Sequence, residues 1–235
     1  MDNITLTVLL STAFTLGLVH TLIGPDHYLP FILLARARNW KIKKTLWITF
    51  ICGVGHVLSS VLIGLIGIAA GIAVASLEGI EGIRGNLASW ALIAFGLVYG
   101  VWGLRRGLKK KPHVHSHLHI NSSEHTHNHI HEGEHSHLHI KKEVTIWTLF
   151  IIFVLGPCEP LIPLVMYPAA HYNWLGVGVV TFVFGVVTVG TMMVLVGLSS
   201  YGLLNLRIRF MERFVHALAG GIIALSGIAI KVLGI

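Results

Sequence analysis

Two short stretches of the chain place ionisable side chains beside a Gly-Pro pair inside otherwise apolar sequence. The first reads HTLIGPDH over residues 20–27, and the second reads GPCEPLIP over residues 156–163. A carboxylate within a hydrophobic run is costly, so Asp26 and Glu159 each indicate a functional site. Each proline also removes one helical hydrogen bond, which frees a carbonyl oxygen of the preceding turn. The two stretches therefore predict broken helices that carry ligand groups.

Imidazole, carboxylate and thiol are the ligand groups in and near these stretches. The predicted metal-binding set is His20, Asp26, His27, His56, Cys158 and Glu159. From the helical rise, Pro25, His56 and Pro157 each lie about 16–22 Å from the nearest basic cluster. Because the hydrocarbon core is about 30 Å thick, these three positions fall near one mid-membrane level. Imidazole with carboxylate suits nickel, cobalt, zinc or copper better than magnesium or calcium.

A second concentration of histidine occupies residues 112–143. It holds eleven of the sixteen histidines, mostly in a His-x-His rhythm: His113, His115, His117, His119, His125, His127, His129, His131, His135, His137 and His139. Neutral imidazole is the commonest protein metal ligand, so this segment predicts capture of divalent ions. No core-forming pattern is present, which favours a disordered segment in the absence of metal.

Helices that cross a membrane must position these residues. The chain is 54% hydrophobic and 11% charged, with a mean hydropathy of +0.77, whereas a soluble domain has about 25% charged residues. Apolar runs cover about residues 4–35, 45–76, 87–104, 144–169, 175–204 and 214–235. Because only helices satisfy their own backbone groups in lipid, the sequence predicts an all-α, polytopic membrane protein with six transmembrane helices.

The two halves of the chain share a pattern of one broken and two continuous spans. Residues 1–111 form the first predicted three-helix repeat, residues 112–143 a His-rich cytoplasmic loop, and residues 144–235 the second repeat. An odd number of spans per repeat makes the two repeats inverted, with spans one and four broken. Inverted repeats with corresponding broken helices and a site near the midplane are typical of secondary transporters.

The basic residues predict the orientation in the cytoplasmic membrane. Fifteen of the seventeen lysines and arginines fall within residues 36–44, 105–142 and 207–213, and six alternating spans place these three clusters on one side. The positive-inside rule makes that side cytoplasmic, so both termini are expected outside. Glu81 and Arg84 are expected in an outer loop between spans two and three. Because the formal charge of +7 belongs to loops, it does not indicate nucleic-acid binding.

At the first-span motif the sequence resembles the nickel/cobalt permeases and, more closely, the NicO and UreH-like membrane proteins of the LysE superfamily. Those families carry an H-x4-D-H motif and often a His-rich loop, whereas His20 here precedes Asp26 and His27 by one residue more. The resemblance implies a secondary transporter rather than an enzyme. Its cargo would be Ni²⁺ or Co²⁺ ahead of Zn²⁺, with no permanent cofactor. The coupling ion stays open, with protons as one candidate.

Two alternatives stand beside this interpretation. The GPCEPLIP stretch also resembles the Pro-Cys motifs of cytochrome-biogenesis electron carriers of the CcdA/DsbD type, which use a pair of membrane cysteines. This chain has two cysteines, Cys52 and Cys158, and the matching first-span position is Asp26. A membrane thiol–disulfide carrier is therefore one alternative, and a UreH-type accessory protein for a nickel enzyme is the other. The sequence leaves the direction of transport and the oligomeric state open.

Overall fold

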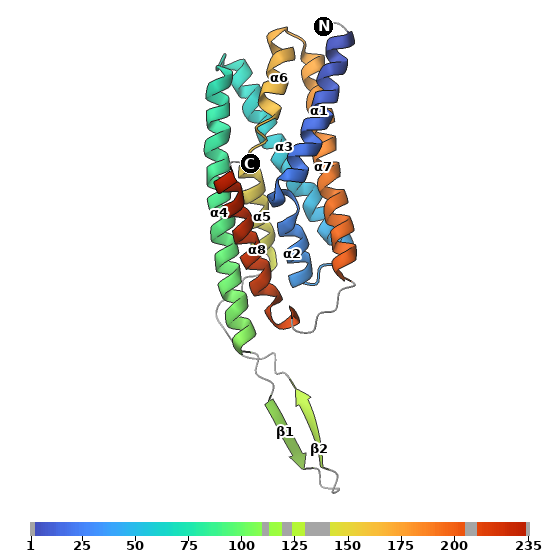
Figure 1. Cartoon of the computed structure of the whole chain (residues 1–235), viewed down its shortest axis with the longest axis vertical. Helices are drawn as coiled ribbons and strands as arrows, with labels where there is room; N and C mark the ends of the chain where they lie inside the picture. Colours follow the sequence, from blue (N-terminus) through green and yellow to red (C-terminus); the bar gives the residue numbers. More distant parts are fainter. Residues whose placement is uncertain (1–2, 110–112, 119–123, 130–141, 205–210, 234–235) are drawn as a thin grey trace.

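The chain folds into a bundle of long helices with a small hairpin at one end (Figure 1). The computed structural model describes residues 3–109, 113–118, 124–129, 142–204 and 211–233. Its elements in chain order are α1 (Asn3–Ile23), η1 (Pro25–His27), α2 (Leu29–Ala37), α3 (Ile42–Ala69), α4 (Val74–Lys109), β1 (His113–Leu118), β2 (Glu124–His129), α5 (Lys142–Leu155), α6 (Leu161–Ala170), α7 (Trp174–Leu204) and α8 (Met211–Leu233).

Helices of the described residues are long and apolar enough to make this a multi-pass membrane protein. Five of them qualify as spans by length and composition: α1, α3, α4, α7 and α8. Helices α5 and α6 are also apolar but shorter than a span. The predicted helical membrane protein is therefore confirmed. The arrangement as six spans in two inverted repeats stays a prediction.

The first predicted break lies where the sequence placed it. Helix α1 ends at Ile23, and a single 3-10 turn, η1, separates it from α2. Gly24 still donates to the carbonyl of His20 at 3.0 Å, but Pro25 has no N–H with which to continue the ladder. The chain therefore leaves the helix just before Asp26 and His27 and turns their side chains out of the α-helical register.

The second predicted break separates α5 from α6. Gly156 donates to the carbonyl of Ile152 at 2.9 Å and completes the last turn of α5. Pro157 then cannot donate to the carbonyl of Phe153, and the chain runs without helix until α6 begins at Leu161. The carbonyl of Phe153 keeps only a contact with the N–H of Gly156 at 3.1 Å, so it is available to side chains from other helices.

Helix α4 begins well before the apolar run from which it was predicted. The run starts at residue 87, but the helix starts at Val74 and extends over 36 residues. Glu81 and Arg84 are therefore helical and are not in an outer loop, and Glu81 is fully buried. The apolar pattern did not predict this first part of α4, because it contains the charged residues Glu81 and Arg84. In the structure these two residues form an ion pair within the helix.

Close backbone contact joins α4 to α8, which lie side by side in Figure 1. Glycines meet along the contact, and a side-chain carbon at Gly220 would overlap the backbone of Gly100 and Gly96. Small residues permit this approach between helices in lipid, where packing drives association. The contact couples the third and last long helices of the chain.

Part of the His-rich segment forms two strands, whereas the sequence favoured disorder in the absence of metal. Strands β1 and β2 pair in antiparallel fashion, and the register places His113 opposite His129, His115 opposite His127 and His117 opposite His125. The histidines predicted for metal capture at positions 119, 131, 135, 137 and 139 lie outside the described residues.

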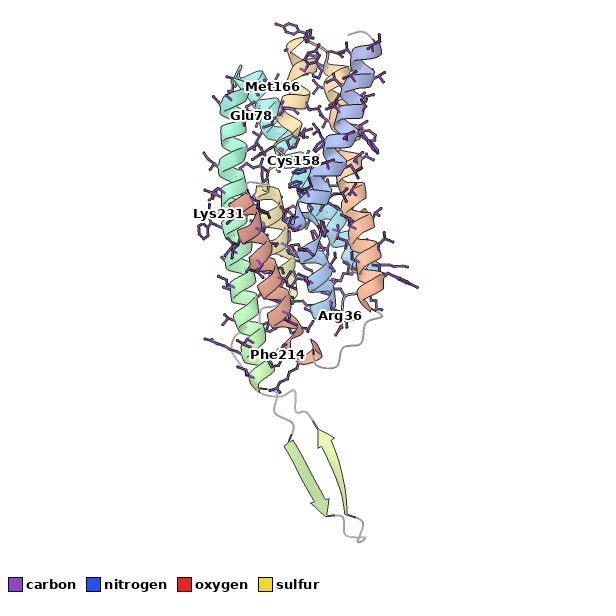
Figure 2. All side chains as sticks on the ribbon, in the orientation of Figure 1. Arg36, Glu78, Cys158, Met166, Phe214 and Lys231 are labelled. Carbon is purple, nitrogen blue, oxygen red and sulfur yellow. The ribbon has the colours of Figure 1, made fainter. Side chains whose placement is uncertain are left out.

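The ends of the bundle are distinct. Arg36 and Phe214 lie at the end that carries the hairpin, whereas Glu78 and Met166 lie at the other end (Figure 2). The N-terminus lies at the end away from the hairpin, but α8 stops about halfway along the bundle (Figure 1). The outward position expected for both termini stays a prediction.

Candidate functional site

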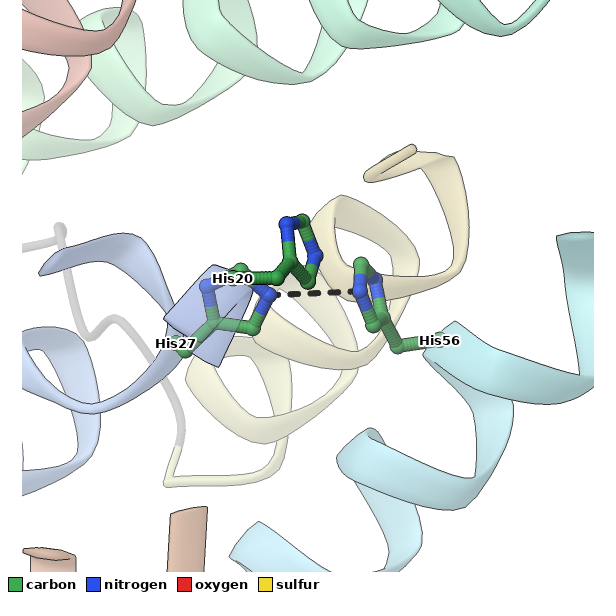
Figure 3. A group of neighbouring side chains, drawn as sticks. All are labelled: His20, His27 and His56. Carbon is green, nitrogen blue, oxygen red and sulfur yellow. Dashed lines mark hydrogen bonds between the residues drawn. The ribbon is translucent and has the colours of Figure 1, made fainter. Parts of the chain in front are cut away.

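Three imidazoles from different parts of the chain converge inside the bundle. His20 comes from the last turn of α1, His27 from η1 and His56 from the middle of α3. One ring nitrogen of each lies within 4.8 Å of the others, and Figure 3 shows His20 beside the gap between His27 and His56. His27 and His56 are buried and His20 is half-buried. The break after Gly24 brings His27 back toward His20, as the sequence predicted.

Backbone carbonyls fix the orientation of two of the rings. His27 Nδ1 lies 3.1 Å from the carbonyl oxygen of Gly24 and 3.2 Å from Asp26 Oδ1. His56 Nδ1 lies 3.1 Å from the carbonyl oxygen of Phe153, which the α5–α6 break has freed. A carbonyl oxygen can only accept a hydrogen bond, so each Nδ1 carries its hydrogen. In neutral rings the Nε2 atoms then face the centre as lone pairs.

A thiol lies against one of these lone pairs. Cys158, in the turn between α5 and α6, is fully buried, and its Sγ is 3.0 Å from His56 Nε2. Since His56 Nδ1 already donates elsewhere, the thiol is the donor in this contact and the imidazole nitrogen accepts. The pair brings a nucleophile and a base together at the second helix break.

A buried charged cluster, which the sequence analysis missed, holds the turn that carries Cys158. The backbone N–H of Cys158 donates to Glu81 Oε2 at 3.1 Å and lies 3.2 Å from Ser60 Oγ. Arg84 forms an ion pair with Glu81 and donates to the carbonyls of Val154 at 2.8 Å and Gly156 at 3.2 Å. We call Glu81, Arg84 and Ser60 the turn clamp. A charge pair three residues apart before an apolar run was its only signal in the sequence.

A cavity of about 440 Å³ opens beside the three imidazoles. His20, His27 and His56 line it together with Asp26 and Glu159. Asp26 is 30% exposed and Glu159 is exposed. Asn86 and Lys231 line the same cavity, and Lys231 Nζ donates to Asn86 Oδ1 at 2.5 Å. The residues on both sides of Cys158 also line it, but Cys158 itself is not among the lining residues.

Most of the predicted site residues come together, in unequal roles. His20, His27 and His56 form the centre, Asp26 contacts His27, and Cys158 contacts His56. Glu159 lines the cavity but is not one of the three converging groups. Cys52 lies one helical turn before His56 but packs in a different apolar cluster from Cys158. The two thiols are both free.

The family comparison overturns the main interpretation of the sequence. A family model described as the cytochrome c biogenesis protein transmembrane region matches residues 12–229, which is most of the chain. No curated protein and no solved structure matches the chain. The assignment to the nickel/cobalt permeases and to NicO and UreH-like proteins is therefore wrong. The nickel/cobalt transport function drawn from that assignment is wrong with it. The first-span motif led to the error because its histidines and Asp26 fit the permease pattern, while the second motif carried the correct signal.

Proposed function

The chain belongs to the family of the cytochrome c biogenesis protein transmembrane region, and from that premise we propose that it is a membrane thiol–disulfide carrier. Its working group is the Cys158 thiol. The observation that carries the proposal is the 3.0 Å contact between Cys158 Sγ and His56 Nε2. A thiol beside an imidazole base is the arrangement that produces a reactive thiolate in proteins.

The first half of the exchange forms a mixed disulfide. His56 Nε2 takes the proton of Cys158, and the thiolate attacks one sulfur of a partner's disulfide. A bond forms between Cys158 and that sulfur while the partner's S–S bond breaks. The released partner thiolate takes up the proton held by His56. Phe153 supports this step because its carbonyl keeps the hydrogen of His56 on Nδ1.

The second half returns the site to its thiol form. A thiol of a second partner loses its proton and attacks the mixed disulfide at the first partner's sulfur. A disulfide forms between the two partners' sulfurs, and Cys158 leaves as a thiolate that regains the proton. A second thiol of the second partner then attacks that partner's own sulfur in this bond, closes the second partner's disulfide and gives its proton to the released thiolate of the first partner. Two electrons thus pass from the two thiols of the second partner to the disulfide of the first, and Cys158 is unchanged overall. The cavity beside Gly156 and Glu159 supports access, because it borders Cys158 on both sides along the chain.

This scheme differs from a carrier with two membrane cysteines. The first-span position that would hold the second cysteine is Asp26, and Cys52 packs away from Cys158. The partners therefore provide the second thiol.

Trapping tests the proposal in membranes that contain the full chain. Membranes are quenched with acid and alkylated, and mixed disulfides are separated without reductant. We expect adducts of the wild type that reductant removes, none with Cys158→Ser, and undiminished adducts with the matched variant Cys52→Ser. Adducts that persist in Cys158→Ser, or their absence from the wild type under all oxidising conditions, would refute the proposal.

A further inference from the structure

The centre of the site holds two ring nitrogens that lie opposite each other. His27 Nε2 and His56 Nε2 are 3.3 Å apart, and the Nδ1 atoms of both rings are held by backbone carbonyls. When both rings are neutral, neither Nε2 has a hydrogen to donate to the other. Two unprotonated nitrogens at this distance repel unless a proton or a metal ion lies between them. The geometry points to an electrophile at this position.

The spacing fits a metal ion with nitrogen ligands. Zinc binds imidazole nitrogen at about 2.0–2.1 Å, and two nitrogens on one tetrahedral ion at that bond length lie about 3.3 Å apart. The distance between His27 Nε2 and His56 Nε2 is 3.3 Å. A third imidazole is in reach, since the ring nitrogens of His20, His27 and His56 all lie within 4.8 Å of one another.

His20 supplies the second, independent observation. Its Nε2 is buried and has no hydrogen-bond partner among the described residues. A buried polar nitrogen without a partner is costly and needs an explanation. An ion placed between His27 and His56 would give that nitrogen a partner.

The surroundings of the rings match those of metal-bound histidines. A ligating histidine characteristically donates its other ring N–H to a carbonyl or carboxylate, which sets the tautomer. The carbonyls of Gly24 and Phe153 do this for His27 and His56, and Asp26 adds a carboxylate beside His27 Nδ1. Both carbonyls belong to the two helix breaks, so the breaks orient the ligands.

We propose that His20, His27 and His56 together bind one divalent transition-metal ion of the zinc type through their ring nitrogens. The ion is a ligand held by the site and is not a transported cargo. Because His56 Nε2 is also the atom that faces Cys158, a bound ion occupies the nitrogen on which the thiol depends. The metal site does not rest on the thiol exchange proposed above.

Metal counting on the full-length purified protein tests the site. The protein is equilibrated with zinc at chelator-buffered free concentrations, so the histidines of residues 112–143 contribute equally to every variant. We expect His20→Gln, His27→Gln and His56→Gln each to bind one ion fewer per chain than the wild type at low free zinc. The affinity of the missing ion should fall by at least about tenfold, since even residues that only orient metal ligands contribute that much.

Two further variants make the outcome decisive. His171→Gln removes an exposed histidine far along the chain and should keep the ion, whereas Cys158→Ser should keep the ion and lose disulfide exchange. A zinc-dependent rise in unfolding temperature should follow the ion count in each variant. His20 Nε2 makes no hydrogen bond among the described residues. His20→Gln therefore removes no hydrogen bond of this atom and is the ligand variant that should disturb folding least. Equal ion counts in the wild type and all three ligand variants would overturn the site and leave a shared proton between the rings.

Discussion

At the scale of single residues, the two motifs predicted which side chains lie close together better than they predicted what those side chains do. Five of the six predicted site residues do meet or adjoin one another, because Gly-Pro breaks are local features that a sequence shows directly. Glu81 could not be found in this way, since a carboxylate among polar neighbours looks like part of a loop. Its burial depends on Arg84 and on the turn near Cys158, which are contacts between helices.

The turn clamp gives a prediction at this scale. Arg84→Met leaves the fully buried Glu81 carboxylate without its ion-pair partner, so the free energy of unfolding should fall by about 3–5 kcal/mol. Glu81→Gln keeps an acceptor for the Cys158 N–H and should cost about 1–3 kcal/mol. Denaturation in mixed micelles measures both, and the exposed Glu78→Gln is the matched control. Additive losses in the double variant would show that Glu81 and Arg84 are not coupled.

At the scale of elements, the breaks and the long helices follow from different physics. Proline removes a backbone donor whatever surrounds it, so both breaks were predictable. The start of α4 was not, because polar residues hide the apolar face of its first turns. The partner of α4 could not be predicted either. Many glycines lie in apolar runs, and only the three-dimensional contact shows that Gly220 meets Gly100 whereas Gly221 meets nothing within 4 Å.

These neighbouring glycines provide a matched pair of substitutions. In Gly220→Ala the added carbon overlaps the backbone of Gly100, so α4 and α8 must separate and the free energy of unfolding should fall by about 1–3 kcal/mol. In Gly221→Ala the carbon enters open space, so the change should stay within about 0.5 kcal/mol. Unfolding in mixed micelles compares the two variants. Equal losses would mean that helix conformation, and not the contact with α4, decides the effect.

At the scale of the whole molecule, composition was sufficient for the class of protein and insufficient for its family. A chain with 54% hydrophobic and 11% charged residues, arranged in long apolar runs, is typical of helices in a membrane. The prediction of the family depended on whether the HTLIGPDH motif or the GPCEPLIP motif was given more weight. Histidines near a helix break suit metal transport, but a Pro-Cys turn beside an imidazole suits thiol exchange, and the chain has both within one site.

The orientation of the bundle is the last prediction. Arg36 lies at the end that carries the hairpin (Figure 2), and Lys41 belongs to the same basic cluster, in the connection between α2 and α3. The positive-inside rule predicts that this end faces the cytoplasm. Tyr172, which joins α6 to α7, is 87% exposed and should then face outward. We expect Tyr172→Cys to react with a membrane-impermeant maleimide in intact cells, and Lys41→Cys, also at an exposed position, to react only after permeabilisation. Both native thiols are buried, so the unaltered chain serves as the control for background labelling. Labelling of Lys41→Cys in intact cells, with Tyr172→Cys protected, would invert the bundle and place the hairpin outside.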